Sequence, residues 1–300
     1  MTAVDEHLAT RSSAGLFDFS FMGLYEFAGI TALEGLQTRR LQDIAPGQAA
    51  YTLLLSDDGS VFNDATVWNL GGDRWWLFTG RPSDFERFRD RARNRSGEHA
   101  ILALQGPRSG VILSRLVGEA TVRALRYFHF GVANGTLVAR LGYSGELGYE
   151  LLVPAGEKRT LRDSLLDAGK AEELAECSFD AANSLRIESG YVLFDREIDG
   201  KANPRELGLE RLVSRPRHFD VSRRLVGLQV EGEELREERV RVQVTSECWS
   251  PTLNARIALG FAPAHAAPGD RVRLADQRAA RVAVLPFYDR DRERPRAAPL

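Results

Sequence analysis

The chain has 300 residues, with 40 Lys and Arg against 42 Asp and Glu and a formal net charge of -2. This length suits one large domain or two to three smaller ones. The balanced charge excludes the overall positive field on which nonspecific nucleic-acid binding depends. No run approaches the ~18 apolar residues of a membrane span, and the first residues lack the apolar core of a signal peptide. We therefore expect a cytoplasmic protein without a nucleic-acid or membrane partner.

In the first two hundred residues, short apolar strands alternate with amphipathic segments, which predicts an α+β or α/β layer structure. Apolar residues at helical spacing predict a helix around Phe85, Phe88 and Ala92, opened by Pro82, and a second helix over 161–168. A third helix is expected over about 179–189, with Ser178 as its N-cap. The predicted strands are 23–28, 60–68, 74–79, 99–105, 135–142 and 149–153.

After about residue 215 the helical period disappears, and short apolar or alternating runs are separated by Gly, Pro and charged residues. This pattern predicts a small β-domain. Its expected strands are 223–230, 239–244, 256–262, 271–274 and 281–285. We expect an α+β region over 1–215, made of two interleaved lobes, a β-barrel domain over 216–288, and a flexible, solvated tail over 289–300.

The chain has no phosphate-binding glycine motif, no clustered His residues and no metal-ligand spacing, and its two Cys are too far apart to suggest a disulfide framework. We expect no metal. Ser144 lies in a Gly-Tyr-Ser-Gly turn that lacks the second glycine of a nucleophile elbow.

The strand 61–68 carries an unusual carboxylate. In an extended strand Phe62, Asp64, Thr66 and Trp68 point to one face, and Asp64 and Trp68 lie roughly 13 Å apart. That distance would span a flat, elongated ligand. The alternative is an edge-strand Asp that faces solvent, and this segment alone favours the alternative.

Two further segments carry charges beside apolar residues. Glu150 shares a strand face with Leu152, so its carboxylate needs hydrogen-bond donors or exposure. A ligand with paired N–H groups would supply the donors, and a neighbouring Arg would serve equally well. Arg186 lies one helical turn after Ala182 on a partly apolar face, which favours a guanidinium that is paired or directed at a ligand. Its alternative is a structural ion pair with Glu188 or Glu197.

Together and in this order, these segments resemble the glycine cleavage T-protein (aminomethyltransferase) family of tetrahydrofolate-dependent enzymes. The resemblance runs nearly from end to end. The matching segments are AGLFDFSFMGLYEFAG at 14–29, LQDIAPGQAAYTLLLSDDGSVFNDATVW at 41–68, ILALQGP at 101–107, GYSGELGYELLVP at 142–154, SLRIESGYVLFDREID at 184–199 and VTSECWSPTLNARIALGF at 244–261.

The resemblance implies an α+β, three-lobed fold with a central folate channel and a small C-terminal β-barrel. It also implies that Asp64 lies beside the reacting end of tetrahydrofolate and is essential. By the same resemblance, Trp68 lines the pterin pocket, Glu150 binds the amino-pyrimidine edge of the pterin, and Arg186 belongs to the folate site. The remaining pocket-lining positions match Tyr143, Met22 and Trp249.

Little acid–base apparatus is needed if the folate N5 nitrogen attacks an activated one-carbon group, because the protein then mainly holds the two reactants in line. The donor is expected to be a small molecule or a lipoyl carrier protein. The chain has Ser20-Phe21-Met22 where the family reads Ser-His-Met, and Asn63-Asp64 where it reads Asp-Asp. These departures predict a transferase whose folate half is intact and whose donor half has changed.

Two alternatives differ in class. The Asn63-Asp64 pair is similar to folate-dependent demethylases or methyltransferases that act on a small methylated substrate. A non-catalytic folate-binding protein is the third reading, but the KGCYxGQE motif of the branch associated with iron–sulfur assembly is absent.

Overall fold

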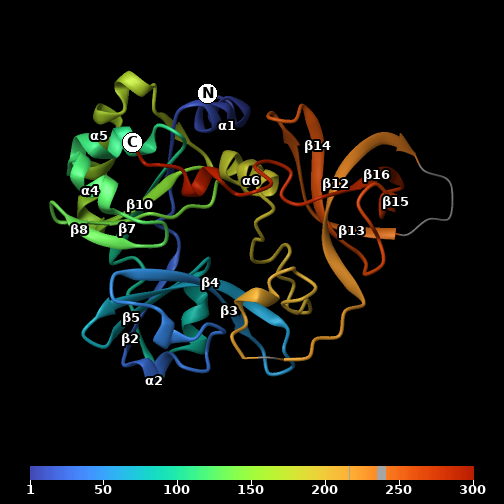
Figure 1. Cartoon of the computed structure of the whole chain (residues 1–300), viewed down its shortest axis with the longest axis horizontal. Helices are drawn as coiled ribbons and strands as arrows, with labels where there is room; N and C mark the ends of the chain where they lie inside the picture. The colour runs from blue at the N-terminus through green and yellow to red at the C-terminus, as the bar shows by residue number, and fades with distance from the viewer. Residues whose placement is uncertain (216, 235–240) are drawn as a thin grey trace.

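The computed structural model describes residues 1–215, 217–234 and 241–300. Two open sheets with their helices form the first part of the chain, and five strands close into a barrel in the last part (Figure 1). The helices α1 and α6 lie between the sheets and the barrel (Figure 1). None of the helices among the described residues is long and apolar enough to span a bilayer.

The first sheet has the order β11-β1-β7-β10-β9-β8, in which β1 pairs parallel with β11 and the other pairs are antiparallel. Its strands are β1 Gly15–Asp18, β7 His99–Gln105, β8 Phe130–Ala133, β9 Thr136–Ala139, β10 Gly148–Pro154 and β11 Ala175–Cys177. The helices on one face are α3 Ser109–Val117, α4 Glu119–Ala124 and α5 Lys158–Ala168. The predicted strands 99–105 and 149–153 and the helix over 161–168 are confirmed, whereas the predicted strand 135–142 is shorter and covers Thr136–Ala139.

The second sheet has the order β3-β4-β5-β2-β6, with antiparallel pairing throughout. Its strands are β2 Gly23–Ala28, β3 Gln48–Leu55, β4 Val61–Gly71, β5 Arg74–Thr79 and β6 Ala92–Asn94, and the short helix α2 is Ile30–Leu33. The chain leaves the first sheet after β1 and returns to it at β7. The two sheets are therefore interleaved along the sequence.

The alternation of side chains along β7 and β10 buries both faces of the first sheet. Leu102 and Leu151 pack toward α3 and α5, whereas Ile101 and Leu152 pack with aromatic residues of the second sheet. An aromatic layer thus lies between the two sheets. Its members are Phe17, Phe19, Trp68, Trp76 and Phe78, with Phe128 and Phe130 packed against it.

The helices α1 Ala3–Ser12 and α6 Phe179–Glu188 pack against each other. The third predicted helix is confirmed, because Ser178 is the N-cap of α6 and its hydroxyl accepts a hydrogen bond from the backbone N–H of Ala181. The sequence analysis did not predict α1, which has a capping box formed by Thr2 and Asp5.

The barrel strands are β12 Arg223–Glu234, β13 Arg241–Ser250, β14 Ala255–Pro263, β15 Arg271–Leu274 and β16 Arg278–Ala283. The barrel closes because β16 pairs with β12 as well as with β15. The five predicted strands correspond to these elements. Residues 239 and 240 of the predicted strand 239–244 lie outside the described residues.

The predicted helix around Phe85 and Ala92 is wrong. The segment forms a 3-10 helix over Pro82–Arg87 and then the strand β6, which pairs with β2. Phe88 packs against the rings of Tyr25 and Phe27, at 5.1 and 5.9 Å between centroids. The apolar spacing therefore serves a turn followed by an edge strand, since tertiary packing overrides a short helical period.

The last twelve residues pack against the α+β region, in contrast to the solvated tail expected from their composition. The tail runs from the barrel back past α6 to the helices of the first sheet (Figure 1). Arg294 pairs with buried Glu146, Arg140 donates to the carbonyl of Ala297, and Leu300 packs on the core beneath α3 and α5. The charges of the tail thus have partners that composition does not reveal.

Candidate functional site

Asp64 lies on β4, and its carboxylate accepts a hydrogen bond of 2.8 Å from the hydroxyl of Tyr51 on β3. The side chain keeps some exposed surface, but protein encloses its carboxylate. Burial raises the pKa of Asp64 to about 6, and the hydrogen bond from Tyr51 opposes that rise. A half-buried carboxylic acid with a raised pKa is a typical feature of a functional site.

Trp68 is fully buried in the aromatic layer between the sheets. Its ring lies 4.9 Å from the rings of both Phe78 and Phe130, and its Nε1 donates to the hydroxyl of Thr66. Phe62 does not share this environment, because a register shift opposite Leu54 and Leu55 interrupts the alternation of β4. Its ring packs with the opposite cluster and lies 4.4 Å from the guanidinium of Arg87.

Glu150 lies on β10 between two small neighbours, Ala103 of β7 and Ala139 of β9. Like Leu152, it faces the layer between the sheets. Within the described residues, no hydrogen bond or ion pair joins its carboxylate, so the neighbouring Arg that the sequence left open as an alternative is not there. Burial raises the pKa of Glu150 to about 7. A half-buried carboxylate without a protein partner fits a ligand that donates hydrogen bonds.

Arg186 of α6 is 1% exposed and forms an ion pair of 2.7 Å with Glu197. Its Nε donates to Asn183 and its Nη2 to Ser246 of β13, while Nη1, which pairs with Glu197, also donates to the carbonyl of Tyr191. The structure therefore contains the structural ion pair that the sequence analysis weighed as the alternative to a ligand contact. Glu188, the other candidate partner, is instead paired with Arg11 and His7.

Tyr143 lies near Asp64. Its hydroxyl donates to the carbonyl of Val192, and its ring stacks on Tyr191 at 5.9 Å. Burial raises the pKa of Tyr143, and the negative charge of Asp64 adds to that rise. Met22 and Tyr143 both pack against the cluster that contains Trp68. Trp68 therefore belongs to this cluster, Met22 and Tyr143 pack against it, and Glu150 lies beside its members Ala103 and Ala139.

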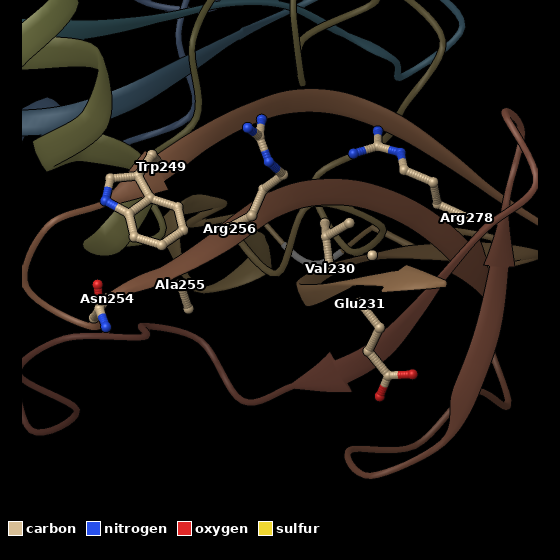
Figure 2. Close-up of a pocket in the computed structure, with 8 residues that line it drawn as sticks. Val230, Glu231, Trp249, Asn254, Ala255, Arg256 and Arg278 are labelled. Atoms are coloured by element: carbon tan, nitrogen blue, oxygen red, sulfur yellow. The ribbon is translucent and has the colours of Figure 1, made fainter. Parts of the chain in front are cut away.

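Trp249 is placed differently. It lies on β13 with its side chain 45% exposed and lines a shallow depression on the barrel, with Glu231 and Arg256 nearby (Figure 2). The arginines of this depression are paired, since Arg256 and Arg278 both bind Glu247. Trp249 is not part of the aromatic layer between the sheets.

The sequence analysis missed Tyr51, because β3 was not predicted. The pairing of β3 with β4 places Tyr51 opposite Thr66 and Leu53 opposite Asp64, which brings the hydroxyl of Tyr51 to the carboxylate. The sequence signal for this contact is the hairpin over 48–71, because pairing of its two strands predicts that Tyr51 lies near Asp64. No group of three potential metal ligands occurs in the part of the chain that the structure describes, and both Cys are free.

The fold and the site together define an α+β protein with a C-terminal barrel, in which two half-buried carboxylates of raised pKa lie on strands that border an aromatic layer. The family model for the GCVT N-terminal domain matches residues 1–217, and the model for the glycine cleavage T-protein C-terminal barrel domain matches residues 223–289. The chain therefore belongs to the glycine cleavage T-protein family, a family of folate-dependent one-carbon transferases.

Curated relatives cover almost the whole chain. An aminomethyltransferase of Halothermothrix orenii is 32% identical over 95% of this chain and 91% of its own length. One of Streptomyces coelicolor is 32% identical over 96% and 90%. The crystal structure of glycine cleavage system aminomethyltransferase T from Bartonella henselae superposes with a TM-score of 0.82 at 25% identity, and the match covers 96% of this chain and 90% of that one.

Proposed function

We propose that this protein transfers a one-carbon group to tetrahydrofolate bound between the two sheets. The observation that carries this proposal is Glu150. Its half-buried carboxylate has no hydrogen-bond or ion-pair partner among the described residues, it is flanked by Ala103 and Ala139, and it shares a strand face with Leu152 of the layer between the sheets. The amino-pyrimidine edge of a pterin offers the paired N–H donors that such a carboxylate lacks.

In this proposal Asp64 is the catalytic residue, and Trp68, Met22 and Tyr143 line the pterin pocket. Tetrahydrofolate supplies the nucleophilic nitrogen that accepts the one-carbon group. Asp64 orients the folate and stabilises positive charge that develops on its nitrogens, while Tyr51 holds the carboxylate in place. The chain needs no His-based triad for these tasks.

The proposal does not place Arg186 or Trp249 among the residues that contact the pterin. Because the guanidinium of Arg186 is occupied by Glu197, Asn183 and Ser246, we assign Arg186 to the support of the folate site rather than to ligand contact. Trp249 lies on the exposed face of the barrel and is left outside the pterin pocket.

The donor in this proposal carries an aminomethyl group, delivered by a lipoyl carrier protein, because the curated relatives are named aminomethyltransferases. Asn63 was one of the sequence features that favoured the demethylase alternative. That side chain is fully buried and hydrogen-bonded to Asp84, so it does not face a donor. No contact of Asn63 therefore favours a second candidate function.

The test is calorimetric titration of the purified protein with tetrahydrofolate and 5-methyltetrahydrofolate, together with turnover assays. We expect Glu150→Ala to weaken binding and Asp64→Asn to abolish turnover with only a modest loss of affinity. Mass spectrometry for methylene- or methyl-folate then identifies the group that is transferred. The proposal fails if the wild-type protein binds neither folate, or if both variants bind and turn over normally.

A further inference from the structure

Asn63 precedes the catalytic carboxylate and faces the other side of β4. It is fully buried, its Nδ2 donates to Oδ2 of Asp84 at 2.6 Å, and its Oδ1 accepts a hydrogen bond of 2.9 Å from the backbone N–H of Asp64. One amide thus joins a distant carboxylate to the backbone of Asp64.

Asp84 is itself held by an arginine. Oδ1 of Asp84 lies 3.2 Å from Nε of Arg81, and Nη1 of Arg81 binds Asp195 at 2.8 Å. The guanidinium of Arg81 also lies over the rings of Phe62 and Phe194, at 5.7 and 5.6 Å. Asn63 is therefore anchored to a cluster that other elements of the fold keep in place.

Among the common side chains of this size, an amide suits this position best. It offers a donor for the carboxylate oxygen of Asp84 and an acceptor for the N–H of Asp64. An Asp at position 63 would place two carboxylates at hydrogen-bond distance, where they compete for one proton. An apolar side chain would leave a buried acceptor and a buried donor unsatisfied.

We propose that Asn63 is a positioning residue for the transfer reaction: it ties the backbone of Asp64 to the Arg81–Asp84 pair and so fixes where the Asp64 carboxylate stands. The expected effect of Asn63 on turnover rests on the proposed function. The positioning of Asp64 by Asn63 rests only on the hydrogen bonds described above. Position 63 then carries an Asn because Asp84 needs a hydrogen-bond donor, and this Asn does not indicate a different one-carbon donor.

The experiment compares Asn63→Asp, Asp84→Asn and the double variant. Asn63→Asp replaces the amide that donates to Asp84 with a second carboxyl, which breaks the tie to Asp84 and brings negative charge closer to Asp64 where it is ionised. We therefore expect the acidic limb of the kcat profile to move up by about one pH unit and turnover near pH 6 to fall about fivefold. The double variant restores one amide and one carboxylate in reversed order, and we expect it to recover most of the wild-type profile.

Asn69 provides the matched control on the same strand. Its amide also bridges two partners, the carbonyl of Ile44 and the N–H of Gly71, but it has no contact with Asp64. Asn69→Asp should lower stability without moving the pH profile. If Asn63→Asp does not fold, Asn63→Ser removes the bond to Asp84 without adding charge, and its turnover and its Asp64 titration are compared with those of the wild-type protein and of Asn69→Asp.

Carboxyl 13C NMR of Asp64, assigned by its loss in Asp64→Asn, gives a readout that does not depend on turnover. A titration of Asp64 that shifts in Asn63→Asp and returns in the double variant supports the positioning role. An unchanged titration and pH profile in all Asn63 variants overturns it. Absence of turnover in the wild-type protein overturns the proposed function instead, while the NMR comparison still decides the role of Asn63.

Discussion

Arg186 and Glu197 form an ion pair of 2.7 Å in which neither side chain is more than 1% exposed. The pair joins α6 to the segment after it and, through Ser246, to β13 of the barrel. A buried pair of this kind is costly to break from one side, because the remaining charge stays in the interior. Arg186 therefore links the α+β region to the barrel.

We predict that Arg186→Met lowers the free energy of unfolding by about 3–5 kcal/mol. The double variant Arg186→Met/Glu197→Leu should be less destabilised, since it removes both charges. Denaturant unfolding measures both. A variant Arg186→Met that keeps its stability but loses folate affinity would instead make Arg186 a direct ligand.

Glu150 makes folate binding depend on pH. Its pKa is raised to about 7 in the folded protein without ligand. Because donors of the ligand favour the ionised form, binding at pH 6 to 7 should release a proton, and affinity should rise with pH through about 7. Calorimetry in buffers of different ionisation enthalpy counts the protons released. Glu150→Gln should bind more weakly, with a flat pH dependence.

The raised pKa of Glu150 also affects the stability of the protein without ligand. The folded state holds the proton of Glu150 more tightly than the unfolded chain, whose value is near 4.5, so this group makes stability fall as pH rises from about 4.5 to about 7. Glu150→Gln should therefore be more stable than wild type at pH 8, by on the order of 1–3 kcal/mol. Equal thermal stability of the two proteins at pH 8 would contradict this burial of the charge.

Glu188 should change the pH dependence of stability in the direction opposite to that of Glu150. Burial opposes its ionisation, but hydrogen bonds and charges from His7 and Arg11 outweigh it and lower the pKa to about 2. Its contribution to stability is present above pH 4.5 and is lost as pH falls toward 2. We expect Glu188→Gln to be destabilised at pH 7 and to show a smaller loss of stability on acidification, measured by urea unfolding between pH 7 and pH 3.

Tyr51→Phe tests the hydroxyl that holds Asp64. The hydrogen bond of 2.8 Å favours the ionised carboxylate, so its removal should raise the pKa of Asp64 above about 6 and move the acidic limb of kcat upward. Turnover at pH 8 should fall less than turnover at pH 6. A uniform loss at all pH values would show that Tyr51 acts in another way.

Gly110 reports on the packing of the C-terminal tail. A Cβ at this position of α3 would lie 1.8 Å from the carbonyl oxygen of Pro299. Gly110→Ala should therefore displace the tail and cost about 1–3 kcal/mol. Limited proteolysis should cleave the tail of this variant faster. Gly156→Ala, whose Cβ would meet no atom within 4 Å, is the control.

The sequence by itself determined the family, most of the strands and the strand positions of Asp64 and Glu150, because collinear motifs and a two-residue period are local properties of the chain. It did not determine which side chains meet. The hydroxyl of Tyr51 reaches Asp64 only through the register of a hairpin, and Arg186 binds Glu197 only because the following segment returns to α6.

The tertiary structure also decided the places of Asn63 and of the tail. The composition of residues 289–300 predicts a solvated tail. In the structure, Arg294 of the tail pairs with Glu146, and the carbonyl of Ala297 accepts a hydrogen bond from Arg140, so these partners are about 150 residues apart in sequence. Partners at such separations are selected by the packing of whole elements, so no local pattern encodes them. The residue types of the site can thus be recognised in local segments of the sequence. Their positions and pKa values depend on contacts between segments that are distant in sequence.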